Sequence, residues 1–356
     1  MRVLMLPRQS NPYQTLLADA LRAQGVQVTL GGGPSRFPVA PLLMAWTRAG
    51  MPRVIHLHWM HRYLEPVMGR KRWAARRTLW ELRVLRRMGV RIVWTLHNIG
   101  DHDGHKGRLE MLFHRRFVEL CDSVICHCAA TRLLAIEAYG LTPALHDRLH
   151  VVPHGNYTGW YADTLGRDAA RSALGLSATD RVFLFVGQVR GYKGVDELLD
   201  VFRSIDAPDA RLIVAGRPNR IQTQTGLERQ AAADPRVTLA LGLVPDDRMQ
   251  VYLRAADAVV LPYRDVLTSG SAILAMTFGR PVIAPAIGCL PESLGSEGTI
   301  LYDPSAPDGL EGALRQALTA DLTALGEQAG AHAATLAWGP IATRTAESYA
   351  GSVAQR

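Results

Sequence analysis

The sequence is poor in cysteine and lacks any long apolar run. Its four cysteines in 356 residues are too few and too clustered for a disulfide framework, since three of them lie between Cys121 and Cys128. The Cys-His-Cys at residues 126–128 has no second ligand pair at zinc-finger spacing. No stretch of about 18 uncharged apolar residues occurs, and the apolar segment at residues 3–6 is too short for a signal-peptide core. We therefore expect neither a membrane-spanning helix nor export.

The composition is that of a folded chain. Apolar residues make up 48% of the sequence and charged residues 20%, a mixture typical of a chain that buries a sizeable core. The length is about twice that of a usual domain. We therefore expect two domains.

The excess of basic residues is confined to one segment. Residues 70–91 hold nine of the 40 lysines and arginines but only one of the 32 acidic residues, Glu81, so 31 residues of each sign remain elsewhere. A neutral body with one basic segment favours a docking surface for an anionic partner.

Strands and helices are expected to alternate along the chain. A strand at residues 1–6, a helix at 13–24 and a strand at 26–30 form a βαβ unit, which implies a parallel sheet. The alternation continues to about residue 152, and a second series starts with the apolar segment at 181–187. The sequence therefore predicts an α/β fold with two Rossmann-like, doubly wound domains that face each other across a cleft. Ligands bind at the carboxyl ends of the strands in such folds.

The first candidate anion site follows the strand expected at 181–187. Gly187 allows a ligand to approach the backbone, and Arg190 and Lys193 place two cations at the carboxyl end of that strand. This arrangement suits a diphosphate, whose charge the two cations would neutralise without a metal. A solvated basic turn is the simpler alternative, but the strand before the loop and the helix after it favour a phosphate site.

The second candidate anion site lies where a helix is expected to begin, at about residue 271. Ser269 or Ser271 is placed to cap this helix, and the free N–H groups of its first turn favour phosphate. Gly270 and Tyr263 belong to the same candidate site. Capping alone would also explain the serines.

Histidines and aspartates gather after the strand expected at residues 90–96. A base that deprotonates an acceptor hydroxyl needs a carboxylate or an imidazole on the cleft floor. The candidates for this base are Asp103, His102, Asp101 and His97, with Asn98, His154 and Asn156 as binding residues nearby. Asp101 and Asp103 could also be a metal-binding Asp-X-Asp pair, but the cations of the phosphate loop already supply a metal's charge, so we expect no metal. A polar loop with a satisfied histidine is the alternative.

The basic segment predicts one cationic face on the helix expected at residues 70–88. With about 100° between successive residues, four arginines fall within about 60° of one another and two tryptophans border them. These residues are Arg72, Arg76, Arg83 and Arg87, with Trp73 and Trp80. Cations flanked by tryptophans are typical of a surface that meets anionic lipid headgroups. A solvated face is the alternative, and nucleic acid is not expected because no basic, aromatic sheet face accompanies the helix.

The loop at residues 190–194, the segment at 268–288 and the closing segment at 338–349 resemble the GT-B glycosyltransferases of the family 4-like group. The resemblance covers nearly the whole chain. In that family an arginine and a lysine of the glycine-rich loop hold the diphosphate of the nucleotide-sugar, and Arg190 and Lys193 match them.

The same resemblance implies the division of the chain. Residues 1–160 would be an acceptor-binding domain, and residues 161–337 would bind the nucleotide-sugar. Residues 338–356 would form a C-terminal helix that crosses back to the first domain.

One departure from the resemblance concerns the stereochemistry. Retaining members of the family carry a Glu-x7-Glu motif, but Val266 and Leu274 occupy the two glutamate positions here. The Thr-Ser-Gly-Ser, Thr-Leu-His-Asn and Pro-His-Gly-Asn-Tyr motifs are more similar to a bacterial branch of inverting β-mannosyltransferases. That branch acts on polyprenyl-diphosphate-linked saccharides in exopolysaccharide biosynthesis.

The resemblance therefore implies a hexosyltransferase that moves mannose from GDP-mannose to a lipid-linked oligosaccharide, with inversion and without a cofactor. The lack of an export signal and the cationic face of the helix at residues 70–88 predict a cytoplasmic protein, peripherally attached to the inner face of the plasma membrane. A retaining transferase that uses UDP-glucose with another acceptor is the alternative among enzymes. A non-catalytic nucleotide-sugar-binding subunit is the alternative from another class.

Overall fold

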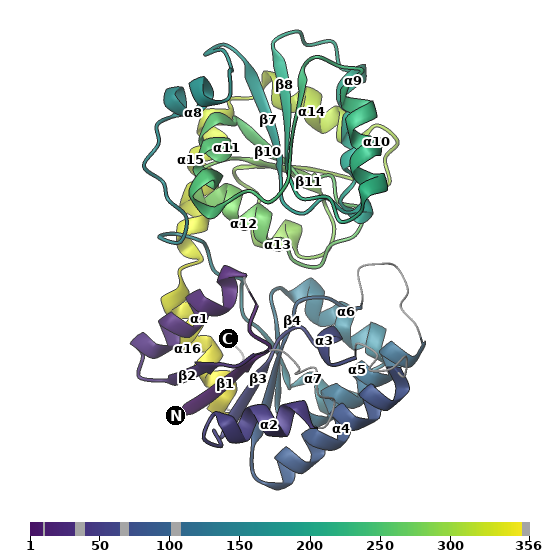
Figure 1. Ribbon diagram of the computed structural model, residues 1–356, viewed down its shortest axis with the longest axis vertical. Coiled ribbons are helices and arrows are strands. Elements are labelled where there is room, and N and C mark those ends of the chain that lie inside the picture. The colour runs from purple at the N-terminus through teal and green to yellow at the C-terminus, as the bar shows by residue number, and fades with distance from the viewer. Residues whose placement is uncertain (10, 33–39, 65–70, 101–107, 351–356) are drawn as a thin grey trace. The chain divides into compact units, whose positions relative to one another are not determined.

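The chain forms two compact units. The computed structural model describes residues 1–9, 11–32, 40–64, 71–100 and 108–350. Unit 1 comprises Met1–Gly155 together with Ala337–Arg356, and unit 2 comprises Asn156–Leu336. Each unit has its own parallel sheet with helices on both faces (Figure 1).

The sheet of unit 1 has six parallel strands in the order β2-β1-β3-β4-β5-β6. The strands are β1 Arg2–Leu6, β2 Gln27–Leu30, β3 Val54–Leu57, β4 Arg91–Leu96, β5 Ser123–Cys126 and β6 Leu149–Val151. Val3 of β1 lies opposite Val28 on one side and Val54 on the other. The strands β3 and β5 are buried along their whole length, as expected where helices cover both faces of a parallel sheet.

The helices of unit 1 pack on the two faces of this sheet. They are α1 Pro12–Ala23, α2 Pro41–Arg48, α3 His61–Leu64, α4 Lys71–Arg87, α5 Arg108–Leu120, α6 Ala129–Tyr139, α7 Pro143–His146 and α16 Trp338–Ala350. The helices α1 and α16 lie together on one face, and α2, α4 and α5 lie on the other (Figure 1). Asn11 caps α1, accepting a hydrogen bond from the Tyr13 N–H at 2.9 Å, and Pro12 occupies the first turn, where its missing N–H costs nothing.

The last helix of the chain belongs to the core of unit 1. Trp338, Ile341 and Tyr349 of α16 are buried in one cluster with Tyr13 and Leu17 of α1. The C-terminal segment therefore completes the hydrophobic core of the unit that contains the N-terminus.

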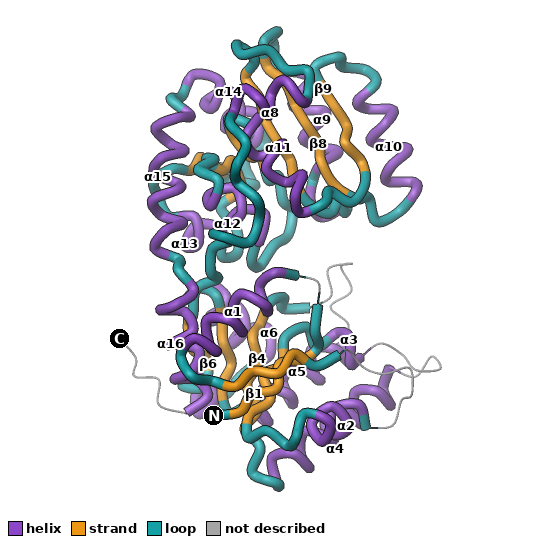
Figure 2. Tube along the Cα trace, turned by 60° about the vertical axis from the view of Figure 1, so that its left-hand side comes forward, coloured by secondary structure: helices purple, strands orange, loops and turns teal. Residues whose placement is uncertain are grey.

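Glu81 fastens α4 to α2, which lies beside it in both ribbon and tube views (Figures 1 and 2). Its Oε2 accepts the N–H groups of Leu42 and Leu43 at 2.7 and 3.0 Å, and its Oε1 lies 3.5 Å from the Arg77 guanidinium. The negative carboxylate therefore faces the positive end of α2. As a result, the one acidic residue of α4 is buried and adds no negative charge to the exposed side of the helix.

Unit 2 has a second six-stranded parallel sheet, in the order β12-β11-β10-β7-β8-β9. Its strands are β7 Arg181–Val186, β8 Ala210–Gly216, β9 Val237–Leu241, β10 Ala258–Val260, β11 Val282–Pro285 and β12 Thr299–Tyr302. The order in which strands are added to the sheet reverses at β7, because β8 and β9 lie on one side of it and β10 to β12 lie on the other. Such a switch point leaves room for a ligand at the carboxyl ends of the strands.

The helices of unit 2 also form two layers. They are α8 Arg167–Ala173, α9 Val195–Ser204, α10 Ile221–Ala231, α11 Met249–Ala255, α12 Gly270–Thr277, α13 Leu290–Leu294, α14 Gly309–Thr319 and α15 Leu322–Thr335, with single 3-10 turns η2 Gly191–Lys193 and η3 Asp246–Arg248. The helices α9, α10 and α14 cover one face of the sheet, and α8, α11, α12 and α15 cover the other (Figure 1).

The predicted α/β fold with two doubly wound parallel sheets is confirmed. The helix α6 was not predicted from the sequence, because its N-cap residue and its apolar periodicity are unusual. Its N-cap is Cys128, whose sulfur accepts the Thr131 N–H at 3.2 Å, and it leaves Leu133 and Leu134 exposed, which weakens the apolar periodicity. In the described part of the chain, no helix combines the length and apolar character needed to cross a membrane.

Candidate active site

The loop after β7 and the start of α12 meet at one point of unit 2. Gly187, which follows β7, has φ of 137°, a conformation open to glycine. A Cβ at this position would lie 2.9 Å from the Ser271 Oγ and 3.8 Å from the Lys193 Nζ. The absence of a side chain at Gly187 therefore leaves a space with a hydroxyl and an ammonium group on its border.

Lys193 is connected to the cap of α12 through one tyrosine. Its Nζ donates to the Tyr263 hydroxyl at 3.2 Å and lies 4.5 Å from the centre of the tyrosine ring. The same hydroxyl lies 3.2 Å from the Ser269 Oγ, which accepts the Ala272 N–H. Ser269 is therefore the N-cap of α12. We call Gly187, Arg190, Lys193, Tyr263 and residues 269–271 the candidate phosphate site.

Two further glycines let the backbones around this site approach one another. A Cβ at Gly194, whose φ is 66°, would lie 2.0 Å from the Pro262 carbonyl oxygen. A Cβ at Gly216, the last residue of β8, would lie 1.7 Å from the Gly187 carbonyl oxygen. Neither distance is compatible with a side chain, so both positions require glycine.

The cations of the candidate phosphate site have no carboxylate partner in the part of the chain that the structure describes. Arg190 and Lys193 form no ion pair there, and the Arg190 Nε is buried without a hydrogen-bond partner. Nearby Arg264, by contrast, is paired with Asp196 at 3.0 Å. A phosphate group would satisfy the unpaired cations and the first turn of α12 together.

Tyr157 adds a hydroxyl that sequence reasoning did not assign to the site. A Cβ at Gly270 would lie 2.7 Å from the Tyr157 Oη, and the Tyr157 N–H donates to the Thr277 Oγ1 at 3.2 Å. Tyr157 lies more than 100 residues before α12 in sequence, so no local pattern indicates that the two meet. Its backbone N–H binds the last residue of α12, and its hydroxyl lies beside the first.

In unit 1 a group of histidines, four of them buried and His97 half-buried, lies at the carboxyl ends of neighbouring strands. One histidine lies within β3, and four others follow β3, β4, β5 and β6. We call these five residues the histidine cluster: His56, His58, His97, His127 and His154. The ring of Tyr13 lies 4.9 to 5.8 Å from those of His58, His97, His127 and His154. Parallel strands end at the same edge of the sheet, which is why residues so far apart in sequence come together.

Hydrogen bonds order the members of the histidine cluster. His58 Nδ1 lies 3.1 Å from His97 Nε2, and His56 bonds the Thr95 hydroxyl at 2.7 Å and the Tyr349 hydroxyl at 2.8 Å. His127 donates from Nδ1 to the Val152 carbonyl oxygen at 3.0 Å, which leaves its Nε2 as an unprotonated acceptor. The ring of Trp59 stacks on that of His97, with centroids 4.5 Å apart.

Burial keeps the histidine cluster uncharged. Desolvation is the largest cause for all five histidines, and repulsion from neighbouring imidazoles adds to it for His56, His58, His97 and His154. The pKa is lowered to about 3 for His56 and His154 and to about 4 for His127, and it falls well below its usual range for His58 and His97. These imidazoles can therefore exchange hydrogen bonds with hydroxyl groups but carry no positive charge near neutral pH.

The remaining predicted site residues are placed differently. Asp101, His102 and Asp103 lie outside the described residues, and Asn98 is half-buried just after β4. Asn156 donates from its side-chain amide to the Ala333 carbonyl oxygen at 2.8 Å. It therefore attaches the start of unit 2 to α15 and does not lie among the residues of the candidate phosphate site. Among the residues that the structure describes, no group of three or more His, Cys, Asp or Glu side chains is arranged to hold a metal ion.

Comparison with known proteins agrees with this architecture. Sucrose-phosphate synthase from Thermosynechococcus elongatus superposes with a TM-score of 0.76 over 98% of both chains at 20% sequence identity. Two parallel doubly wound domains of this kind define a GT-B glycosyltransferase fold.

Sequence comparison identifies the family. Residues 180–320 match the family described as "Glycosyl transferases group 1". The chain is 30% identical to GDP-mannose:glycolipid 4-beta-D-mannosyltransferase of Xanthomonas campestris pv. campestris over 303 residues, which cover 83% of this chain and 76% of the relative. It is 28% identical to a D-inositol 3-phosphate glycosyltransferase of Corynebacterium aurimucosum over 84% of this chain and 72% of that one. The chain belongs to the group 1 glycosyltransferases and is a glycosyltransferase enzyme.

Because burial keeps the histidine cluster uncharged, we predict that unit 1 loses stability in mild acid. In the folded protein the pKa values of these histidines lie below the unfolded value of about 6.5. The free energy of unfolding therefore has its full value above pH 6.5, where the histidines are uncharged in both states. As the pH falls below 6.5, the unfolded chain binds protons that the folded chain cannot. Each such histidine then removes up to about 1.4 kcal/mol per pH unit. Urea unfolding followed by tryptophan fluorescence should show a falling free energy of unfolding between pH 7 and pH 5.

Tryptophan fluorescence is a suitable probe because six of the seven tryptophans lie in unit 1, and only Trp160 lies in unit 2. A His154→Gln variant should show a shallower dependence on pH, by about one proton. A free energy of unfolding that is constant from pH 7 to pH 5 would contradict the account of these histidines.

Proposed function

We propose that this glycosyltransferase moves mannose from GDP-mannose to a lipid-linked oligosaccharide, with inversion at the transferred sugar. The observation that carries the proposal is the candidate phosphate site, where the Lys193 ammonium and the Ser271 hydroxyl at the capped start of α12 border the space beside Gly187. Arg190 follows in the same loop and makes no ion pair among the described residues. The name of the Xanthomonas relative supports the choice of GDP-mannose and of a glycolipid acceptor.

The candidate phosphate site suits the leaving group of such a transfer. Breaking the bond between mannose and the nucleotide leaves negative charge on the diphosphate. Arg190, Lys193 and the N–H groups at the start of α12 would stabilise that charge as it develops. Ser271 would donate a hydrogen bond to a phosphate oxygen from beside Gly187.

Inversion is supported by the residues at the positions of the missing glutamates. Val266 and Leu274 are both buried and apolar, so neither offers a carboxylate to the sugar. An inverting transfer requires instead a base for the acceptor hydroxyl. The segment after β4 supplies our candidates, Asp103 first and then Asp101 and His102, and His97, which directly follows β4, is a member of the histidine cluster.

The exposed side of α4 supports peripheral binding of the protein to an anionic membrane. We define the basic face as Arg72, Arg76, Arg83 and Arg87 together with Trp73 and Trp80. All six side chains are exposed, the two tryptophans by 44% and 53%. The four arginines make no ion pair in the part of the chain that the structure describes, and Glu81 is buried beneath them. Anionic lipid headgroups would supply negative charge to the four arginines, and the indole rings would lie among the headgroups.

The first test concerns the diphosphate. Arg190→Ala or Lys193→Ala should lower kcat/KM for GDP-mannose by at least about tenfold, or about 1.4 kcal/mol in the barrier, because each removes a charge that faces the leaving group. Steady-state kinetics with a radiolabelled donor measure the effect. Arg229→Ala on the exposed side of α10 is the matched control and should leave the kinetics unchanged. Unaltered kinetics in both site variants would remove this assignment.

The second test concerns the base. Asp103→Asn should lower transfer by at least about 100-fold, because the amide cannot accept the hydroxyl proton. Binding of GDP-mannose, measured by calorimetry, should be retained. Asp101→Asn is the neighbouring control and should stay active. An active Asp103→Asn enzyme together with an inactive Asp101→Asn enzyme would move the role to Asp101.

The third test concerns the membrane. Replacing the four arginines of the basic face by glutamine should release the protein from anionic liposomes at low salt. Each arginine contributes about 1 kcal/mol near such a surface. Transfer to a lipid-linked acceptor should slow, while transfer to a short soluble acceptor should not change.

The matched control removes four exposed arginines of unit 2, which changes the net charge equally: Arg203, Arg229, Arg248 and Arg315. This control should still bind liposomes in a sedimentation assay. Equal binding by wild type and both variants would show that the basic face is only a solvated surface.

A further inference from the structure

A cavity of about 360 Å³ lies in unit 2 at the amino ends of β10 and β11. The candidate phosphate site lies at the carboxyl ends of the strands, so the two occupy opposite edges of one sheet. Three arginines line the cavity, from three separate elements: Arg167 on α8, Arg254 on α11 and Arg280 before β11. We call this cavity the arginine pocket.

Close backbone packing forms one wall of the arginine pocket. Gly279 has φ of 63°, and a Cβ at Gly326 of α15 would lie 2.4 Å from the Gly279 carbonyl oxygen. The second turn of α15 is thereby held against the turn before β11. Phe278 and Leu322 supply apolar surface beside it, while the three guanidinium groups supply the polar side.

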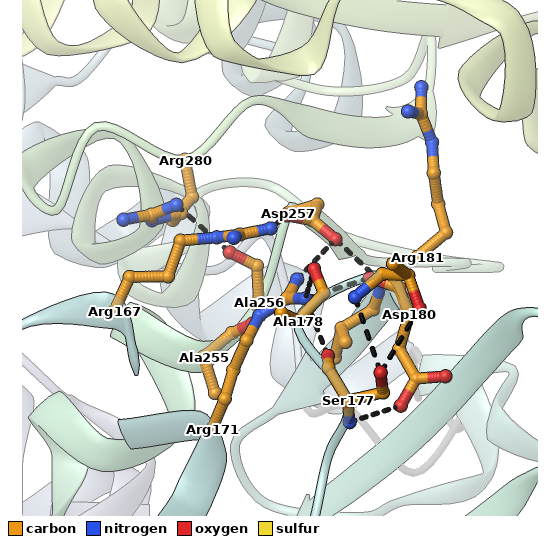
Figure 3. A network of polar contacts seen from close by, with 12 residues as sticks. Arg167, Arg171, Ser177, Ala178, Asp180, Arg181, Ala255, Ala256, Asp257 and Arg280 are labelled. Atoms are coloured by element: carbon orange, nitrogen blue, oxygen red, sulfur yellow. Dashed lines mark hydrogen bonds and ion pairs between the residues drawn. The ribbon is translucent and has the colours of Figure 1, made fainter. Parts of the chain in front are cut away.

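Two of the three arginines are already neutralised. Arg254 makes a bidentate pair with Asp163, at 2.6 and 2.5 Å. Arg167 lies 2.8 Å from Asp257, which also accepts from Arg171 at 2.7 Å and from the Val182 N–H at 2.8 Å (Figure 3). Both oxygens of the Asp257 carboxylate are therefore engaged, Oδ1 by Arg167 and Oδ2 by Arg171 and the Val182 N–H.

Arg280 is the arginine of the pocket that has no direct ion pair in the described part of the chain, since Asp257 and Asp163 act on it only from beyond ion-pair distance. Its Nη1 donates to the Ala256 carbonyl oxygen at 2.9 Å, its Nε is buried without a partner, and it makes no ion pair among the described residues. Burial, followed by repulsion from Arg254, lowers the pKa of its guanidinium to about 10, although attraction by Asp257 and Asp163 partly opposes this shift. It stays charged at neutral pH, and Figure 3 shows it beside Arg167. The remaining acid of the lining, Glu327, is exposed to solvent.

We propose that the arginine pocket binds a small phosphate monoester, such as a sugar phosphate, with the phosphate on Arg280. A phosphate group would accept from the Arg280 guanidinium and attract Arg167 and Arg254 from either side. The volume falls within the range of about 300 to 1,000 Å³ usual for small-ligand cavities. Such a volume exceeds the needs of inorganic phosphate alone, and the apolar wall at Phe278 and Leu322 suits the carbon skeleton of an ester.

The experiment is calorimetric titration with mannose 6-phosphate, glucose 6-phosphate and inorganic phosphate at low ionic strength. Wild type should bind one sugar phosphate, at least about tenfold more tightly than inorganic phosphate. Binding should persist in an Arg190→Ala, Lys193→Ala double variant, which separates this site from the candidate phosphate site. Arg280→Gln should weaken binding at least tenfold, and Arg167→Gln, at a more exposed position, should weaken it less.

Arg229→Gln is the matched control and should bind like wild type, with folding of every variant checked by circular dichroism and melting temperature. If Arg280→Gln does not fold, the Arg167→Gln result decides, and unchanged affinity there overturns the proposal. Absence of binding to wild type, or loss of binding only in the Arg190→Ala, Lys193→Ala variant, also overturns it. Equal affinity for inorganic phosphate and for both esters would contradict the assignment of an ester ligand.

Discussion

The candidate phosphate site depends on the close approach of three backbones at the carboxyl edge of the unit 2 sheet. Gly216 packs against the Gly187 carbonyl oxygen, and Gly194 packs against that of Pro262. A methyl group at either position would overlap a backbone atom and push the loops apart. This packing places the Lys193 ammonium against Tyr263, which in turn contacts the cap of α12. The positions of the functional groups in the site thus depend on backbone contacts made by glycines, which have no functional side chain themselves.

The sequence predicts much of this fold because central strands such as β3, β5 and β7 are apolar and buried, and because helices of ordinary length separate them. The apolar segment at β7 and the glycine-rich loop after it carry local signals that a single sequence displays. In contrast, α6 has cysteine as its cap and exposes two leucines. The four-residue strand β12 is recognisable only through its pairing with β11. Such elements are determined by tertiary contacts rather than by local propensity.

The charged residues of the candidate phosphate site could be predicted from their position after an apolar strand. The contacts between residues far apart in sequence could not be predicted. Arg190 and Lys193 stand out because two cations follow an apolar strand, and parallel strands gather their ends at one edge. The close approach of Tyr157 to Gly270 joins segments far apart in sequence. No periodic pattern in the sequence predicts this contact. The same holds for the arginine pocket, since Arg167, Arg254 and Arg280 are ordinary surface residues until α8, α11 and β11 bring them together.

The central claim is that the loop after β7 and the first turn of α12 hold the diphosphate of the nucleotide-sugar. A crystal structure of the protein with GDP tests it most directly. The account predicts phosphate oxygens within about 3 Å of the Lys193 Nζ, the Ser271 Oγ and the N–H groups at the start of α12, which is hydrogen-bonding distance. A nucleotide whose diphosphate lies elsewhere, with Arg190 and Lys193 in solvent, would contradict the account.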